Sequence, residues 1–246
     1  MVYDLQLDKW DMLWFGLMWF AMTVLKNQLV LIGGRDVLTY KRVSKLRVLN
    51  ESQDPQTWSF PFPPMSAARD AATAIVHDDR WLVVVGGWSN DATTEYELSK
   101  VEIMDTSSKK WYLSAPLPQP CCHISAAIAG NMLLLVGGCS RSHPSTKVFG
   151  ACLDDLIHQT VSTSANTFPT QSPWCTLPDT PLPFSTALSL NGALLAVGGQ
   201  KIGVYDMCGV KTICLYQPNT KTWVKAGEMP IERWQCACVV LPNGEI

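Results

Sequence analysis

One short pattern occurs four times along the chain: a run of aliphatic residues that ends in two glycines. The runs occupy residues 29–34, 82–87, 133–138 and 194–199, and they end in Gly33–Gly34, Gly86–Gly87, Gly137–Gly138 and Gly198–Gly199. The first glycines of successive pairs are 53, 51 and 61 residues apart. Self-similarity at a period near 50 residues indicates a repeat architecture, in which each repeat is one small folding unit packed on its neighbours.

A tryptophan marks a second fixed place in each unit. These residues are Trp10, Trp58, Trp111, Trp174 and Trp223. In three of the four units that start at a glycine pair, the tryptophan lies 24 residues after the second glycine, and Trp174 lies 36 residues after Gly138. Tyr3, Met104 and Tyr216 each lie seven residues before a tryptophan, whereas Leu49 lies nine residues before Trp58. The regular register indicates that these tryptophans are structural.

The remaining pattern of a unit predicts four short strands. A proline-rich turn follows each tryptophan, and proline ends a strand because it cannot donate to the ladder. Next come small-residue strands at 71–76, 125–129, 186–190 and 236–241, three of which end at an Asn/Gly turn of the kind that favours hairpins. The aliphatic run then predicts a strand buried on both faces. Glycine at its end permits positive φ and close backbone approach.

These glycine pairs and spaced tryptophans resemble the kelch repeat, and the resemblance covers almost the whole chain. It implies an all-β, kelch-type β-propeller. We expect four complete blades and a split or incomplete fifth, in a fragment of a larger ring. The predicted blade parts are 1–14, 15–60, 66–114, 120–176, 182–226 and 232–246. Residues 139–173 form a predicted long inserted loop, either functional or simply a tolerated surface insertion.

Composition limits the partners and the compartment. The 19 basic and 21 acidic side chains give a net charge of −2, so there is no basic stripe for nucleic acid. The uncharged run at 12–25 is shorter than the ~20 residues that span a bilayer, so no membrane partner is expected. Nine cysteines, an odd number without a disulfide framework, favour reduced thiols and a cytoplasmic location.

We expect no catalytic residue, cofactor or metal, and therefore no enzyme. The four histidines show no metal-ligand spacing, and neither the Cys121–His123 group nor Cys236 and Cys238 have the paired zinc spacing. No P-loop, nucleophile elbow or dinucleotide fingerprint occurs.

Recognition by loops is the remaining function. Turns after the glycine pairs and turns leading into the small-residue strands are expected to project from the two ends of the propeller. The candidate partner-binding residues are Arg35, Trp88, Asn90, Arg141, His143, Gln200 and Lys201. We interpret Arg69 and Arg233 as structural links between blades. The resemblance implies a protein-interaction module, with a ubiquitin-ligase assembly as a partner by family analogy. The alternative is a small-ligand or enzymatic site at the propeller mouth.

Overall fold

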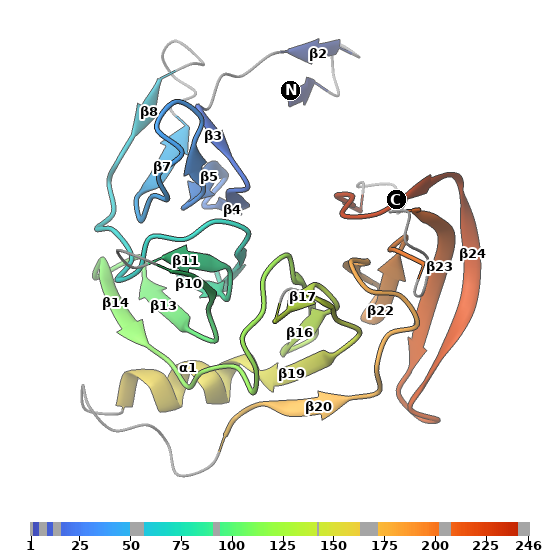
Figure 1. The fold of residues 1–246 in the computed structure, drawn as a ribbon. Helices are drawn as coiled ribbons and strands as arrows, with labels where there is room; N and C mark the ends of the chain where they lie inside the picture. The colour runs from blue at the N-terminus through green and yellow to red at the C-terminus, as the bar shows by residue number, and fades with distance from the viewer. Residues whose placement is uncertain are drawn as a thin grey trace.

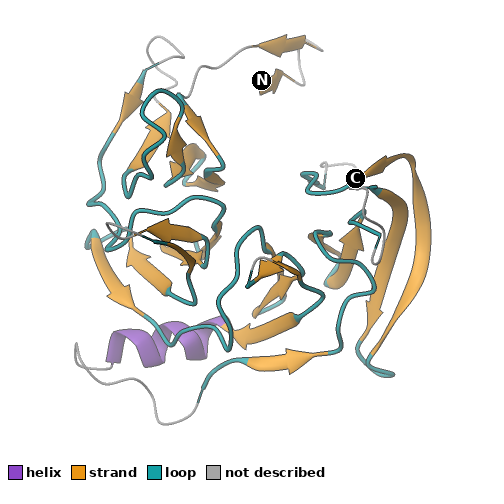
Figure 2. Ribbon diagram, in the orientation of Figure 1, coloured by secondary structure: helices purple, strands orange, loops and turns teal. Residues whose placement is uncertain are grey.

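A computed structural model describes residues 2–4, 9–11, 16–49, 57–90, 94–141, 143–162, 172–201 and 208–240. Four antiparallel four-stranded sheets follow one another along the chain. They lie side by side as blades around a common axis (Figure 1), with strands and loops making up nearly all of the described structure (Figure 2). The predicted kelch-type β-propeller with four complete blades is confirmed.

Each blade has the same order of strands. Blade 1 consists of β4 (Ala21–Leu25), β5 (Gln28–Ile32), β7 (Leu46–Leu49) and β8 (Trp58–Ser59). Blade 2 consists of β9 (Thr73–His77), β10 (Trp81–Val85), β13 (Val101–Asp105) and β14 (Lys110–Leu113). Blade 3 consists of β15 (Ser125–Ala129), β16 (Met132–Val136), β19 (Val148–Cys152) and β20 (Cys175–Leu177). Blade 4 consists of β21 (Thr186–Leu190), β22 (Ala193–Val197), β23 (Val210–Gln217) and β24 (Thr222–Arg233).

Short two-stranded ribbons accompany the blades. They are β1 (Val2–Asp4) with β2 (Lys9–Asp11), β3 (Leu17–Met18) with β6 (Arg35–Asp36), β11 (Trp88–Asn90) with β12 (Glu95–Glu97), and β17 (Cys139–Ser140) with β18 (His143–Pro144). In each of the last three ribbons, one strand begins directly after a glycine pair. Within the described ranges, no helix is both long and apolar enough to cross a membrane.

The spacing of the tryptophans is explained by the pairing of the two outer strands. Trp111 lies opposite Met104, and Trp223 lies opposite Tyr216. Leu49 also lies directly opposite Trp58, so the two extra residues between them enlarge the connection and leave the pair intact. In the N-terminal hairpin Tyr3 lies opposite Trp10 in the same way. The landmark seven residues before a tryptophan is therefore its cross-strand partner.

All the loops named in the sequence prediction lie at one end of the propeller, and the expectation that they project from two ends is wrong. Because the strands of a blade are antiparallel, β9 runs away from the entry to its blade and β10 returns to the same end at its glycine pair. The turn after the glycine pair and the turn into the next blade therefore share this end, which we call the loop end. The opposite end carries the β9–β10 and β13–β14 hairpin turns.

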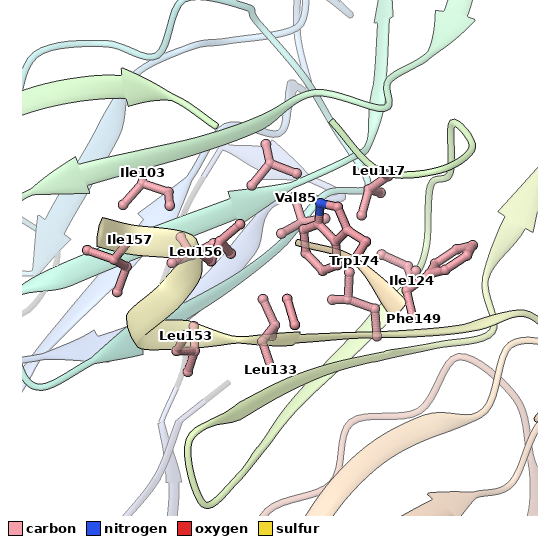
Figure 3. Packing of buried hydrophobic residues seen from close by; sticks show 14 of the residues in the cluster. Val85, Ile103, Leu117, Ile124, Leu133, Phe149, Leu153, Leu156, Ile157 and Trp174 are labelled. Atoms are coloured by element: carbon pink, nitrogen blue, oxygen red, sulfur yellow. The ribbon is translucent and has the colours of Figure 1, made fainter. Parts of the chain in front are cut away.

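The predicted inserted loop at 139–173 is wrong for most of its described part. Residues 148–162 form β19 and the helix α1 (Leu153–Ser162). Leu153, Leu156, Ile157 and Thr160 are buried, at the i, i+3, i+4, i+7 spacing of an amphipathic helix. Figure 3 shows this face of α1 against residues of blades 2 and 3, where it joins the largest core cluster. The insertion therefore covers the seam between two blades, and residues 163–171 lie outside the described ranges.

The predicted strand at 236–241 is also wrong where it can be seen. Residues 236–240 form no strand, because the described residues provide no second strand beside them, and 241–246 lie outside the described ranges. The backbone just before them nevertheless resembles a blade entry. Gln235 has a φ of 48°, and the residues at the corresponding place in the four blades, Trp19, Ala71, His123 and Phe184, have φ between 50° and 55°.

Candidate functional site

The glycine pairs form the joints of the loop end. Gly87 has a φ of 100°, and a Cβ there would lie 2.6 Å from the backbone oxygen of Asp70, at the entry to its own blade. The Gly87 N–H donates at 2.8 Å to the backbone oxygen of Cys121, at the entry to the next blade. Only glycine fits this close approach. Each pair thus places the residues that follow it at the loop end.

A charged group of four side chains spans blades 1 and 2 at this end. The Nε of Arg35 lies 2.7 Å from Oδ2 of Asp70, and the Nε of Arg42 lies 3.2 Å from the same oxygen. Both arginines also approach Oε1 of Glu95, at 3.3 and 2.9 Å. The Asp70 side chain is only 2% exposed, whereas that of Glu95 is 58% exposed. The buried carboxylate of Asp70 is thus paired with two arginines, while the carboxylate of Glu95 faces solvent.

The pKa shifts in this group follow from the pairing. Burial disfavours the charged form of Arg42, but hydrogen bonds and attraction from Glu95 and Asp70 outweigh burial and raise the pKa of Arg42. The hydrogen bond from Arg42 lowers the pKa of Glu95. Burial lowers the pKa of the neighbouring His123, against the attraction of Asp70. These directions favour charged Arg42 and Glu95 and a neutral His123 near neutral pH.

Two cavities open at the centre of the loop end. The channel, of about 460 Å³, is lined by one segment from each of the four blade entries and by residues 235–238. A smaller mouth pocket of about 240 Å³ lies beside it, lined by the charged group with Trp19, Ala71, Trp88 and His123. The guanidinium of Arg35 lies 5.3 Å from the ring centre of Trp19, which is within the range of a cation–π contact.

The structure brings some of the predicted partner-binding residues together. Arg35 and Trp88 line the mouth pocket, and Asn90 accepts a 3.2 Å hydrogen bond from Nη1 of Arg42. Arg141 lines a separate cavity of about 360 Å³ with Lys147, and Nδ1 of His143 lies 2.6 Å from the Arg141 backbone oxygen.

Gln200 and Lys201 follow the glycine pair of blade 4. The N–H of Gln200 donates to the backbone oxygen of Pro183 at 2.8 Å, and that of Lys201 donates to Cys208 at 3.2 Å. Neither residue lines the mouth pocket.

The interpretation of Arg69 as a link between blades is confirmed. Its side chain is fully buried, contacts Glu102 and donates at 3.1 Å to the Gly86 backbone oxygen, while its own backbone oxygen accepts from Gly34 of blade 1 at 2.8 Å. The same interpretation of Arg233 stays a prediction: its backbone oxygen accepts from Gly199 of its own blade at 2.9 Å, and its side chain is exposed.

Sequence reasoning missed four exposed apolar side chains of the loop end in blades 1 and 2. Trp19, Leu38, Tyr40 and Tyr96 are 54%, 86%, 66% and 43% exposed. Leu38 and Tyr40 belong to the loop after β6, where Oδ1 of Asp36 accepts from the N–H groups of Leu38 and Thr39 at 3.1 and 2.8 Å. An aspartate whose side chain accepts from the N–H groups two and three residues later is a common turn signal. Asp36 could therefore have been recognised as a turn residue in the sequence.

Among the residues that the structure describes, two side-chain groups each bring three possible metal ligands together. The ligand atoms of Glu97, Cys122 and Cys139 lie within 4.8 Å of one another, and so do those of His77, Asp78 and Asp154. The second group is explained by a hydrogen-bond contact, since Nε2 of His77 lies 3.2 Å from the exposed carboxylate of Asp154.

Comparisons with known proteins agree with this architecture. No protein-family model matches the chain. The chain is 23% identical over 142 residues to Kelch repeat and BTB domain-containing protein 1 of Camelpox virus, and 24% identical over 137 residues to the protein of that name from Ectromelia virus. These matches cover 57% and 56% of this chain but 24% and 22% of the relatives, so the chain spans about a quarter of their length.

A solved structure, that of YjhT, superimposes with a TM-score of 0.71 at 13% identity, over 92% of this chain and 75% of that one. At this identity the likeness concerns the fold. With its four blades, its glycine pairs and its similarity to kelch-repeat proteins, the chain is a kelch-type β-propeller.

Proposed function

We propose that the chain is a non-catalytic interaction module that binds a protein partner through the loop end of blades 1 and 2. The observation that carries the proposal is a set of exposed side chains on the segments that carry the charged group: Trp19 lines the mouth pocket, Leu38 and Tyr40 lie between Arg35 and Arg42, and Tyr96 follows Glu95. Tryptophan and tyrosine are enriched among the residues that dominate binding energy, because they bury a large area at a small loss of side-chain freedom.

The charged group gives this surface its specificity. Asp70 is buried under two arginines, so the solvent meets the guanidinium of Arg35 and the carboxylate of Glu95. A partner that presents an acidic and a basic side chain at matching positions fits this arrangement, since a guanidinium holds a carboxylate with two parallel hydrogen bonds. Apolar side chains of the partner would cover Tyr40 and Tyr96.

The curated relatives support the class of function. Their names describe them as kelch-repeat and BTB-domain proteins. By family analogy, this chain would recruit its partner to a ubiquitin-ligase assembly in the cytoplasm. That part of the proposal rests on analogy with longer proteins, because folds do not determine partners.

The experiment compares partner recovery by matched variants. The full chain, with an affinity tag, is expressed in cells of the organism that encodes it. Three forms are compared: wild type, Tyr40→Ala/Tyr96→Ala, and Lys110→Ala as a control, because Lys110 lies at the opposite end of the propeller. A recovered protein is then purified and its Kd measured for all three. We expect the double variant to weaken binding by about tenfold or more and Lys110→Ala to have no effect. Equal affinity of the double variant and wild type would refute the proposal.

A small-ligand site in the channel is the second candidate, favoured by its volume. About 460 Å³ lies within the range of ligand pockets, and Thr73, Ser125 and Thr186 offer hydroxyl groups around it. A thermal-shift screen of metabolites tests it, with Ala74→Phe to fill the channel. A compound that raises Tm in wild type but not in Ala74→Phe would support this function, and absence of any such compound counts against it.

A further inference from the structure

Glu97, Cys122 and Cys139 come from two blades and meet at one point of the loop end. Cys122 lies at the entry to blade 3, Cys139 follows the glycine pair of that blade, and Glu97 ends the β11–β12 hairpin of blade 2. Cys122 and Cys139 are separated by 17 residues, a spacing that no short zinc motif has, so the sequence gives no sign of the group.

The backbone holds the two thiols on one side of a ladder. Cys122 and Cys139 form an antiparallel bridge, with N–H···O distances of 3.0 and 2.9 Å in the two directions. Residues that exchange both hydrogen bonds lie directly opposite each other and direct their side chains to the same face. The position of the sulfurs therefore depends on main-chain bonds, which makes the pair rigid.

The carboxylate is aimed at both sulfurs. Oε1 of Glu97 lies 3.9 Å from Sγ of Cys122 and 3.9 Å from Sγ of Cys139. Its other oxygen, Oε2, accepts a hydrogen bond from the backbone N–H of Arg141. A tetrahedral zinc ion with Zn–S near 2.3 Å and Zn–O near 2.1 Å separates sulfur and oxygen ligands by about 3.6 Å. The two sulfur–oxygen distances are thus within a few tenths of an ångström of those in a zinc site, and all three ligand atoms lie within 4.8 Å of one another.

We propose that Glu97, Cys122 and Cys139 bind one Zn²⁺ ion with three protein ligands and an open fourth position. Thiolate and carboxylate together suit zinc better than the hard cations, which take only oxygen. On binding, two Zn–S bonds and one Zn–O bond form, each thiol releases its proton to solvent, and no electrons are transferred. The ion would tie the β11–β12 hairpin of blade 2 to blade 3, independently of the proposed protein partner.

The burial of the ligands fits such a site. Cys122 is fully buried, whereas Cys139 and Glu97 are partly exposed. The partly exposed ligands leave the group accessible to Zn²⁺ from solvent. The backbone N–H of Arg141 donates to Oε2 of Glu97 and so orients the carboxylate, as hydrogen-bond partners of the ligands do in known zinc sites.

The test is binding of Zn²⁺ to the full chain, under reducing conditions, in competition with a chromophoric chelator. We expect one Zn²⁺ per chain, and an affinity loss in Cys139→Ser greater than the roughly 10- to 100-fold caused by losing an outer-shell partner. Glu97→Gln should lose about tenfold or more. His77→Ala, which disrupts the other group, and Cys175→Ser, an exposed thiol, should bind as wild type does.

Cobalt provides a measurement that does not depend on any variant folding. Co²⁺ bound to wild type should show the charge-transfer absorption of thiolate ligands. The proposal is overturned if wild type binds no Zn²⁺, if Cys139→Ser binds it as tightly as wild type, if His77→Ala abolishes binding, or if the cobalt spectrum lacks the thiolate band.

Discussion

The indole Nε1 of Trp111 donates a 2.9 Å hydrogen bond to the backbone oxygen of Pro63, which lies in the proline-rich turn after the tryptophan of the preceding blade. The same bond recurs at the next two seams. Trp174 donates to Ala115 at 3.1 Å, and Trp223 donates to Pro178 at 3.0 Å. In blades 2, 3 and 4 the tryptophan is therefore tied to the turn that leaves the blade before it, which explains why the two features occur together in these units.

Trp111→Phe should keep most of the ring packing and remove this donor. The Pro63 oxygen then loses its partner, so we expect the free energy of unfolding to fall by about 1 kcal/mol. The measurement is the urea midpoint at unchanged m-value. Trp174→Phe is the comparison, and it should lose more because Trp174 is only 8% exposed and leaves its acceptor away from solvent. Unchanged midpoints for both variants would show that the bonds contribute nothing.

Gly87→Ala should destabilise the protein far more than Gly130→Ala. Both glycines have positive φ, 100° and 59°, but a Cβ at Gly87 meets the Asp70 oxygen at 2.6 Å and a Cβ at Gly130 meets nothing within 4 Å. The left-handed backbone costs about 1–2 kcal/mol in each, and the clash adds roughly 1–3 kcal/mol at Gly87 only. Equal losses of stability in the two variants, measured by thermal unfolding, would argue against the role of Gly87 as a joint of the loop end.

Arg69→Leu should be among the most destabilising changes in blade 2. It leaves Glu102, which is 2% exposed, as a buried carboxylate without its guanidinium. Glu102 would keep only the 2.8 Å hydrogen bond from the Ser66 N–H. We expect a loss of about 3–5 kcal/mol, and a smaller loss in Arg69→Leu/Glu102→Leu, because replacing both charges removes the unpaired one. A double-mutant cycle by denaturant unfolding measures the difference, and strictly additive losses would contradict the coupling.

Acid should remove stability through Asp105. The hydrogen bonds from Arg80, at 3.0 and 2.9 Å, hold the pKa of Asp105 well below its usual range. A carboxyl whose folded pKa is depressed stabilises the fold fully above its unfolded pKa, near 3.9, and loses that contribution as pH falls toward the folded value.

Asp105→Asn should therefore lower stability at pH 7 and flatten its decline below about pH 4. Asp179→Asn, which removes an exposed pair with Lys147, is the control and should change little. Unfolding curves between pH 2 and 7 give the comparison, and parallel pH profiles for wild type and Asp105→Asn would be inconsistent with this role.

The fold could be predicted from the sequence because its determinants are local and repeated. Gly86–Gly87 and Trp111 recur at fixed spacing in other units, and the closure between blades requires those residue types. Helix α1 was missed because it occurs once, although Leu153, Leu156 and Ile157 have helical spacing. The strand expected at 236–241 failed for the opposite reason, since its residues match the repeat but the described structure gives 236–240 no partner strand.

The candidate site could be predicted only in part. The glycine pairs placed Arg35 and Trp88 at the loop end, but the partners of Arg35 lie 35 and 60 residues away, at Asp70 and Glu95. Which side chains meet across two blades depends on register and on blade packing, and a single unit contains neither. The same holds for Cys122 and Cys139 with Glu97, whose distances in sequence carry no motif.

Photo-crosslinking inside cells tests the central claim, partner binding by the loop end, most directly. A photoreactive phenylalanine analogue replaces Tyr40, Tyr96 or, at the opposite end, Lys110 in the full chain, and crosslinked proteins are identified by mass spectrometry. The account predicts that positions 40 and 96 crosslink to the same protein and that position 110 does not. Crosslinks to a protein partner from position 110, with none from 40 or 96, would contradict it.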